Sequence, residues 1–455
     1  MDKRSKYGIY HSILNSEDTL KKLADKCMAE IMKRERICAM NVVPCLVLGP
    51  AITDFLAWML MRAREQGIKR LYFLARDGYF MYMGASKLCT HYHIPIECRY
   101  LECSRFSLRL PAYHKNIEEA LDFICRGGID VTLRKILMRA GLTTEEVEIV
   151  GEQMEESTKL DEILNYSQIR KFAGKLRESE LFMFLLDVHS KDAYENAVGY
   201  FIQEGMTEDI PYALVDSGWT GSMQYALQKL LQDKGVHRQI HGFYWGLYEI
   251  PVNARREDYE AYYFTPEHHL KRKADFSNCL FECIFSAPAG MTVRYGKGEK
   301  YYPVYGRVHG PNCEMINCVE RYLNNYWDCF MENVENIDKI GNESCRKVIS
   351  RLVKRFMSFP SYEEAELFGK LLFSDDILDG NVQKVAAPLS ESELTDNHAL
   401  RRIAIMSGHC SRKLKESAWY EGSAVLYGES KAKKHIMQYR LYKYLIYIRK
   451  WWKNI

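Results

Sequence analysis

The chain has 455 residues, of which 47% are hydrophobic and 27% charged, and its 63 basic and 60 acidic residues give a formal net charge of +3. The length exceeds the roughly 250–300 residues at which a single core stops growing, and the composition is that of a folded protein. A charge this close to neutral argues against nucleic-acid binding as a global property, so a charged ligand has to be recognised by a local patch.

The cysteines and the apolar stretches favour a protein that works in the cytoplasm. Fourteen cysteines are scattered without the CxxC spacing that lets two thiolates share a metal ion. The basic start at residues 1–4 is followed by polar residues, so we expect no secretion signal. Residues 42–61 are apolar enough to suggest a membrane span, but Pro44, Pro50 and Asp54 lie within them and a charge near the bilayer centre is costly.

The first part of the chain predicts two helices and a short strand. Residues 16–36 carry apolar side chains at helical spacing behind a serine, which indicates a long amphipathic helix. Residues 43–48 predict a short strand. Pro50 then begins a core helix that runs to about Gln66, where Gly67 stops it.

A strand, a polar loop and a helix follow. Residues 71–75 form a continuous apolar run that is typical of a strand covered on both faces. The run leads into Arg76, Asp77 and Gly78, and a helix is expected over residues 79–90. This order predicts that the polar loop lies at the carboxyl end of the strand.

The next strand ends in a second polar tip, and helices follow it. Residues 98–103 predict a strand that leads into Ser104 and Arg105, so two neighbouring strand ends each present an arginine. Residues 116–191 carry few β-branched runs and predict a helical insertion that forms a cap or side wall. Residues 192–205 predict a further helix.

The order of the remaining elements predicts a Rossmann-like α/β fold with a mainly parallel sheet. Residues 210–216 form a buried strand, residues 222–233 a helix, and residues 241–248 the next strand, which is a βαβ order. We expect this α/β core to span residues 1–306, with a mostly helical region over residues 307–455.

The strongest functional signal follows the buried strand that ends at position 216. This segment combines an acid, glycines, hydroxyls and the start of a helix, in the order Asp216, Ser217, Gly218, Trp219, Thr220, Gly221 and Ser222, with Gln224 shortly after. Glycines let backbone N–H groups converge on an anion, and a helix N-terminus favours a phosphate. A tight strand-to-helix turn with a serine cap explains the same residues equally well.

Two further sets of residues could carry chemistry. In the Arg76-Asp77-Gly78 loop the guanidinium can grip a diphosphate, and the carboxylate can hold Mg²⁺ or accept a proton. Such a loop more often holds a surface ion pair in an ordinary turn. Its place after a strand favours a binding role, because ligands of open α/β sheets bind beyond the carboxyl ends of the strands. Glu282 lies within an apolar stretch, where burial would raise its pKa and suit proton transfer, although such a residue is more often half exposed on a helix.

The motifs of P-loop enzymes, zinc proteases and α/β-hydrolases are absent from the sequence, as is the DxDx[TV] acid pair.

The last segment, residues 431–455, interleaves basic and aromatic side chains. They include Arg440, Lys443, Arg449, Lys450, Trp451 and Trp452. Such a helix suits peripheral contact with the inner face of the cytoplasmic membrane, or docking on the protein core with one solvated face.

Five segments together resemble a known family. VLGPAITDFLAWML, LYFLARDGYFM, YLECSRFSLRLPA, ALVDSGWTGSMQ and FECIFSAPAGMT, spread over about residues 42–305, are similar to the glycan phosphoribosyltransferase region of bacterial ribofuranosyltransferases. Members of this family often carry that region behind a phosphatase domain of the haloacid dehalogenase type. Because the chain has no dehalogenase acid motif, we expect a separate phosphatase to remove the 5-phosphate.

The resemblance implies a phosphoribosyltransferase-like fold and a transfer of 5-phosphoribosyl from phosphoribosyl pyrophosphate (PRPP) to a hydroxyl of a surface-polysaccharide glycan, with a lipid-linked glycan as a candidate acceptor. It implies that Ser217, Gly218, Thr220, Gly221 and Ser222 bind the 5-phosphate, that Asp216 binds ribose, that Arg76 and Arg105 bind pyrophosphate with Mg²⁺, and that Gly78, Ser104, Trp219 and Gln224 also line the substrate site. Asp77 is the first candidate for metal ligand and base, and Glu282 is the second candidate for base. Two alternatives stay open: a hydrolase or phosphotransferase acting on a sugar phosphate, and a non-catalytic PRPP-binding component of a polysaccharide assembly complex.

Overall fold

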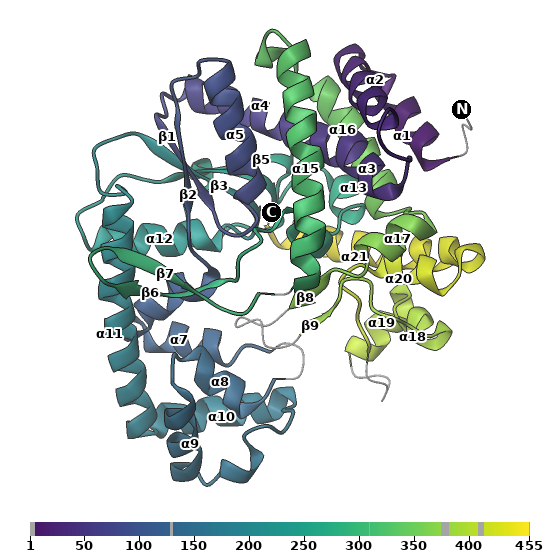
Figure 1. The fold of residues 1–455 in the computed structure, drawn as a ribbon. Helices are drawn as coiled ribbons and strands as arrows, with labels where there is room; N and C mark the ends of the chain where they lie inside the picture. The colour runs from purple at the N-terminus through teal and green to yellow at the C-terminus, as the bar shows by residue number, and fades with distance from the viewer. Residues whose placement is uncertain (1–4, 128–130, 309, 375–381, 408–413, 455) are drawn as a thin grey trace.

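The structure is a computed structural model that describes residues 5–127, 131–308, 310–374, 382–407 and 414–454. The basic start of the chain at residues 1–4 lies outside this described part. Figure 1 shows a central sheet with helices on both faces and a large group of helices below it.

The sheet has five strands, all parallel, in the order β2-β1-β3-β4-β5. The strands are β1 (Arg70–Leu74), β2 (Glu97–Leu101), β3 (Tyr212–Trp219), β4 (His241–Leu247) and β5 (Tyr259–Phe264). The expected mainly parallel α/β fold is therefore confirmed. The edge strand β5 was not predicted from the sequence.

Side chains of the inner strands alternate between two apolar cores. Leu71 and Phe73 of β1 lie in one buried cluster, and Tyr72 and Leu74 lie in another on the opposite face. The second cluster is completed by α11 (Glu180–Gln203) and α12 (Ser222–Gln232). This double coverage explains why the strand reads as a continuous apolar run.

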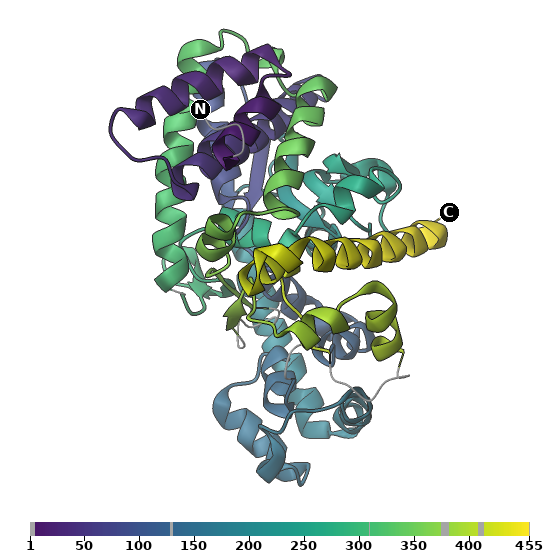
Figure 2. The same cartoon turned by 90° about the vertical axis from the view of Figure 1, so that its right-hand side faces the viewer.

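Helices from both ends of the chain build the core on the first face. They include α1 (Lys6–Leu14), α2 (Asp18–Met32), α4 (Gly49–Glu65), α5 (Tyr79–His91), α14 (Asn278–Phe285), α15 (Gly310–Asn333) and α16 (Glu343–Met357). Their buried side chains form one cluster with those of the sheet, and Figure 2 shows α15 and α16 beside the N-terminal helices. The C-terminal region therefore shares the core of the sheet.

The strand expected over residues 43–48 is wrong. The structure has α3 (Ala39–Val43), a π-helical turn (Pro44–Leu48) and then α4 without a break. The run is apolar on every side because it is buried on every side, and periodicity alone does not separate a short buried strand from a buried helix. Ala39–Glu65 is long and apolar enough to cross a membrane, and 94% of its most apolar window is buried inside the protein, as in the core helix of a soluble protein.

The expected helical insertion is present. Its helices are α7 (Ile117–Ile124), α8 (Leu133–Arg139), α9 (Thr144–Gln153) and α10 (Tyr166–Glu178), and they follow α6 (Arg105–Arg109) and a 3-10 turn (Leu110–Lys115). They share a separate core that also includes the start of α11. The break expected near residue 191 is wrong, because α11 is continuous and has no proline and no glycine before Gly199.

Two small antiparallel hairpins interrupt the later part of the chain and were not predicted. They are β6 (Thr292–Lys297) with β7 (Tyr301–Tyr305), and β8 (Leu372–Ser374) with β9 (Val382–Lys384). The rest of this part is helical, as expected. Its remaining helices are α13 (Leu270–Ala274), α17 (Tyr362–Phe368), α18 (Glu391–Asp396), α19 (Ala399–Met406), α20 (Tyr420–Tyr427) and α21 (Glu429–Asn454).

Candidate functional site

The strand order places a switch point between β1 and β3. From β1 the chain crosses to β2 on one side, and β3 pairs with β1 on the other side before the chain continues outward to β4 and β5. In open α/β sheets, ligands bind beyond the carboxyl ends of the strands at such a point. Arg76 and Asp77 follow β1 here, and Asp216 to Trp219 form the end of β3.

The ends of β1 and β3 are joined by side chains. The Ser217 hydroxyl donates a hydrogen bond to Oδ2 of Asp77. Burial raises the pKa of Asp77, and the positive charges of Arg76 and Arg105 oppose this rise. The two arginines that the sequence singled out therefore lie close enough to Asp77 to act on its charge.

Three carboxyl groups from different segments lie within electrostatic reach of one another. Burial raises the pKa of Asp216 well above its ordinary value, and the charges of Asp77 and Glu282 raise it further. Burial also raises the pKa of Glu282 to about 7, again with a contribution from Asp77. Arg105 opposes the rise at all three acids. The structure thus brings together five predicted residues, which we call the carboxylate–arginine cluster: Arg76, Asp77, Arg105, Asp216 and Glu282.

Trp219 fixes the position of Glu282. Glu282 lies on α14, which begins after a Ser277 cap, and its Oε1 accepts a hydrogen bond from the indole N–H of Trp219. The indole ring packs against Phe276 and Phe281 at centroid distances of 5.4 and 5.9 Å. Trp219, predicted to line the substrate site, therefore joins β3 to α14 and holds a carboxylate in place.

Backbone conformation and close packing explain the two glycines of the predicted phosphate-binding segment without a ligand. The segment is not a long turn, because β3 continues to Trp219. Gly218 has φ +113°, and a Cβ there would lie 2.3 Å from the carbonyl oxygen of Gly246 on β4. Gly221 has φ +60°, and its Cβ would lie 2.5 Å from the ring of Tyr259. Both positions require glycine with or without a ligand.

The start of α12 remains suited to an anion. Gly221 is the residue before the helix and has no side chain to cap the first amides. The exposed Thr220 hydroxyl donates to Oγ of Ser222 at 3.3 Å, and Ser222 is half-buried. Uncapped N-terminal amides with the helix dipole behind them favour a negatively charged group.

Three predicted substrate-binding residues are occupied by internal contacts. A Cβ on Gly78 would lie 2.4 Å from the carbonyl oxygen of Leu74. Ser104 caps α6 and donates to the carbonyl of Thr292 at 2.7 Å. Gln224 is buried, and it donates to two backbone carbonyls and accepts from a tyrosine hydroxyl: Ile240 at 2.8 Å, Asp258 at 3.1 Å and Tyr244 at 2.6 Å. These contacts are structural. The presence of a polar residue in the sequence does not show whether its side chain binds a ligand or another part of the protein.

Tyr100 was missed by the sequence analysis. It lies on β2, its hydroxyl is buried, and it has no hydrogen-bond partner within the described ranges. Burial raises the pKa of Tyr100, and Asp77 is among the charges that raise it further. Its position in a strand next to the predicted loop was the only sequence signal that could have found it.

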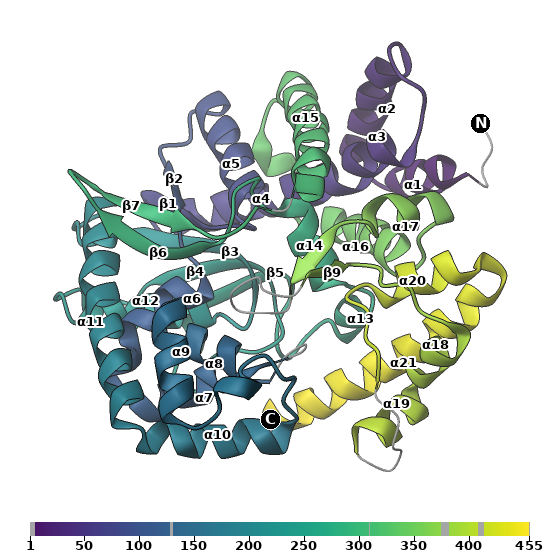
Figure 3. The same ribbon diagram turned by 60° about the horizontal axis from the view of Figure 1, so that its bottom comes forward.

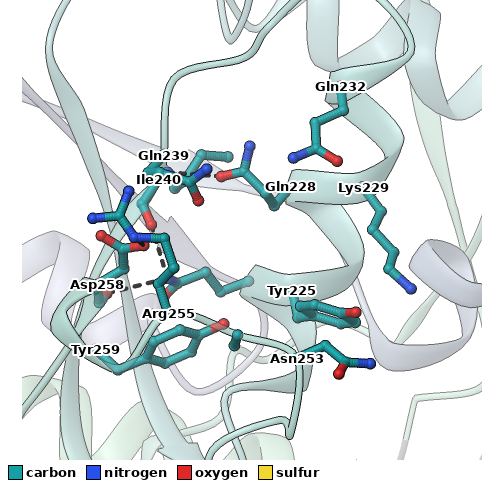
Figure 4. A pocket seen from close by; sticks show the side chains of 12 residues that line it. Tyr225, Gln228, Lys229, Gln232, Gln239, Ile240, Asn253, Arg255, Asp258 and Tyr259 are labelled. Atoms are coloured by element: carbon teal, nitrogen blue, oxygen red, sulfur yellow. Dashed lines mark hydrogen bonds and ion pairs between the residues drawn. The ribbon is translucent and has the colours of Figure 1, made fainter.

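A polar pocket of about 230 Å³ lies beside α12 (Figure 4). Figure 4 shows Tyr225, Gln228, Lys229 and Gln232 on the helix, facing the segment before β5. Gln224 is the only predicted site residue in its lining, and the five members of the carboxylate–arginine cluster take no part in it. The pocket and the cluster are therefore separate features.

Metal binding by protein side chains alone has no support in the described part of the chain, where no group of three or more His, Cys, Asp and Glu side chains could hold an ion.

Comparisons with known proteins identify no family for this chain. No protein-family model matches the chain, and no curated protein matches it. The function has to be argued from the site and from the resemblance of the sequence segments.

Proposed function

We propose that the protein is a glycan phosphoribosyltransferase, which moves 5-phosphoribosyl from PRPP to a hydroxyl of a surface-polysaccharide glycan and releases pyrophosphate. The observation that carries this proposal is the carboxylate–arginine cluster beside the start of α12, at the switch point of a parallel sheet. A donor with an anionic group at each end of a ribose needs two separate anion sites with polar groups between them. The cluster and the helix start supply these parts.

The two anionic ends of the donor call for different partners. Arg76 and Arg105 carry planar guanidinium groups that match pyrophosphate oxygens with paired hydrogen bonds. Thr220 and Ser222 offer hydroxyls to the 5-phosphate, together with the uncapped amides at the start of α12. In this assignment Gly218 and Gly221 serve the backbone geometry, and Ser217 orients Asp77.

The raised pKa values of Asp216 and Glu282 suit a hydrogen-bond donor and a general base, respectively. Burial and the two acidic neighbours raise the pKa of Asp216 and so favour its protonated form, whose carboxyl group can donate a hydrogen bond to a ribose hydroxyl. Glu282, with a pKa of about 7, is close to the value at which a general base works best at neutral pH. We therefore favour Glu282 as the base, and we assign Asp77, which Ser217 orients, to the metal ion.

The reaction breaks the bond between the anomeric carbon and the pyrophosphate oxygen and forms one to the acceptor oxygen. The leaving oxygen takes the bonding electrons, and the two guanidiniums stabilise its charge. The acceptor hydroxyl attacks the anomeric carbon and loses its proton to Glu282. The product keeps the 5-phosphate, so a phosphatase step has to follow to leave plain ribofuranose.

Mg²⁺ fits this arrangement as a companion of the donor. Mg²⁺ is commonly bound by one or two carboxylates together with substrate phosphates, so the lack of a three-residue protein site does not conflict with it. The charge of Asp77 raises the pKa of both Asp216 and Glu282, so a cation near these acids would relieve the repulsion, and Asp77 would hold it. When bound, the ion neutralises charge on the pyrophosphate.

The test is incubation of the purified protein with PRPP, Mg²⁺ and a panel of lipid-linked and synthetic glycans. We expect release of pyrophosphate and a glycan that gains the mass of one phosphopentose. Release of inorganic phosphate from sugar phosphates without pyrophosphate would identify a hydrolase or phosphotransferase. Tight PRPP binding without pyrophosphate release on any glycan would identify a non-catalytic PRPP-binding component.

A further inference from the structure

The C-terminal helix α21 has an inner face that is held by the rest of the protein. Its Arg440 donates to Oδ2 of the buried Asp275 at 2.8 Å, and its Lys443 donates to Oε1 of Glu421 at 2.7 Å. Lys450 pairs with Glu249 in the same way. Three of the four cations that the sequence suggested for a membrane surface therefore form ion pairs with acids of the protein itself.

Two tyrosines of this helix, Tyr442 and Tyr447, also face inward. The ring of Tyr447 stacks on Tyr248 with a centroid distance of 5.2 Å and an interplanar angle of 4°. Tyr442 is buried, and its hydroxyl contacts the sulfur of Met406 on α19. These contacts fix the rotation of α21 about its axis and so determine which side chains point outward.

The outward face is an apolar stripe, which we call the α21 stripe. It consists of Met437, Leu441, Leu445, Ile448 and Trp451, with exposed fractions of 48, 48, 40, 39 and 40%. Steps of four, four, three and three residues keep these side chains on one side of a helix. Figures 2 and 3 show α21 in yellow as a long helix on the outside of the molecule. The side chain of Trp452 lies outside the described part.

Exposed cations accompany the α21 stripe. Lys433 and Lys434 lie one turn before Met437, and Arg449 follows Ile448 directly. All three are exposed, and within the described ranges none of them has an ion pair. The helix as a whole carries eight lysines and arginines against one glutamate.

We propose that the α21 stripe lies flat on an anionic phospholipid surface. Apolar side chains along one face of a helix enter the boundary between headgroups and acyl chains, while flanking lysines and arginines meet lipid phosphates. Trp451 at the end of the stripe is a side chain that favours this boundary. The cations without partners distinguish lipid from a protein surface, which would have to supply matching acids.

The test uses the full chain and vesicles, and it does not depend on the proposed transferase activity. Flotation is measured with vesicles of phosphatidylcholine alone and of phosphatidylcholine with phosphatidylglycerol. We expect binding to the anionic vesicles only, and weaker binding at high salt because the lysines and arginines are screened. The double variant L441E/L445E should reduce the partition coefficient by about tenfold or more, since each added carboxylate enters the apolar boundary.

A matched control is available on α11, where Phe184 and Val188 are exposed by 64 and 44% and are also four residues apart. F184E/V188E should bind vesicles like the wild type. Equal loss of binding in both double variants would overturn the proposal, as would binding that ignores lipid charge. Absence of vesicle binding, with a dimer that L441E/L445E dissociates, would assign the α21 stripe to a second copy of the chain. Thermal melts of both variants establish that they fold.

Discussion

The hydroxyl of Ser217 on β3 donates a hydrogen bond to the carboxylate of Asp77 in the loop after β1. This contact joins two strands that lie side by side in the sheet but are far apart in the sequence. It fixes the direction of Asp77 at the switch point of the sheet, where the arginines and the other two acids converge.

Substitution of Ser217 by alanine should weaken catalysis through Asp77. A hydrogen bond to a charged group contributes about 1.5–3 kcal/mol, which corresponds to roughly a tenfold to hundredfold loss in kcat/KM. Pyrophosphate release measures the loss. The acid limb of the profile of kcat/KM against pH should also shift in this variant, because the charge of Asp77 raises the pKa of Glu282. A variant with wild-type kcat/KM would remove Ser217 and Asp77 from the mechanism.

Loss of either guanidinium should weaken use of the donor. We expect Arg76→Ala and Arg105→Ala each to lower kcat/KM by about tenfold to a hundredfold, with a higher KM for PRPP. Arg255→Ala is the control, since Arg255 is exposed and pairs with Glu257 at 2.7 Å, outside the cluster. If all three variants behave alike, the arginines do not bind pyrophosphate.

Removal of the hydroxyl at the start of α12 should act on the other end of the donor. Thr220 is exposed, and its hydroxyl forms a hydrogen bond only to Ser222 among the described side chains, so Thr220→Ala should leave the melting temperature unchanged. Its kcat/KM should fall by about tenfold when a bond to the 5-phosphate is lost. Isothermal titration with ribose 5-phosphate reports the same loss without catalysis. Unchanged affinity for that ligand would contradict the assignment.

The ionisation of Glu282 should govern both activity and stability. As a base it has to be ionised, so activity should rise as pH increases through about 7, and Glu282→Gln should lose most activity. For stability, the pKa rises from 4.5 to about 7 on folding, so the folded state holds the extra proton between these values. Unfolding free energy therefore falls as pH increases through this window.

Glu282→Gln tests the stability part directly, since glutamine keeps an oxygen for the Trp219 indole and has no proton to lose. Thermal melts at several pH values should give the variant a flatter profile between pH 4.5 and 7 than the wild type. Parallel profiles for the two proteins would show that Glu282 keeps its ordinary pKa.

Two glycines allow the cost of a left-handed backbone conformation to be compared with the cost of a steric clash. Gly218→Ala places a methyl group 2.3 Å from the Gly246 carbonyl at φ +113° and should cost about 2–4 kcal/mol of unfolding free energy. Gly235 has φ +82° with no atom within 4 Å of its Cβ, so Gly235→Ala should cost only about 1–2 kcal/mol. Urea unfolding measures both. Equal costs would mean that β3 and β4 can separate to admit a side chain.

The inner strands could be predicted because both of their faces are buried, so each strand is a continuous run of apolar residues. The edge strand β5 was missed because Tyr259, Glu260 and Ala261 are only half-buried and interrupt such a run. The misassigned residues 43–48 have the opposite character, since a helix buried on every side has no polar face to reveal its period.

The members of the site were easier to predict than their arrangement. Arginines and acids at strand ends follow from strand prediction alone. The bond between Trp219 and Glu282 does not, because it depends on the packing of α14 near β3, where Phe276 and Phe281 contact the indole ring. The internal hydrogen bonds of Ser104 and Gln224 likewise depend on neighbours that are distant in sequence.

The short helix α6 belongs to two cores at once. Its Phe106 packs in the core of the helical insertion, while Leu108 packs in the core beneath the sheet. Arg105 is the first residue of this helix, so its guanidinium is positioned by both units, whereas Arg76 lies two residues after the end of β1. Repacking deep inside the insertion would therefore change the spacing of the two arginines, and substitutions remote from the reacting atoms would tune how tightly an anion is gripped.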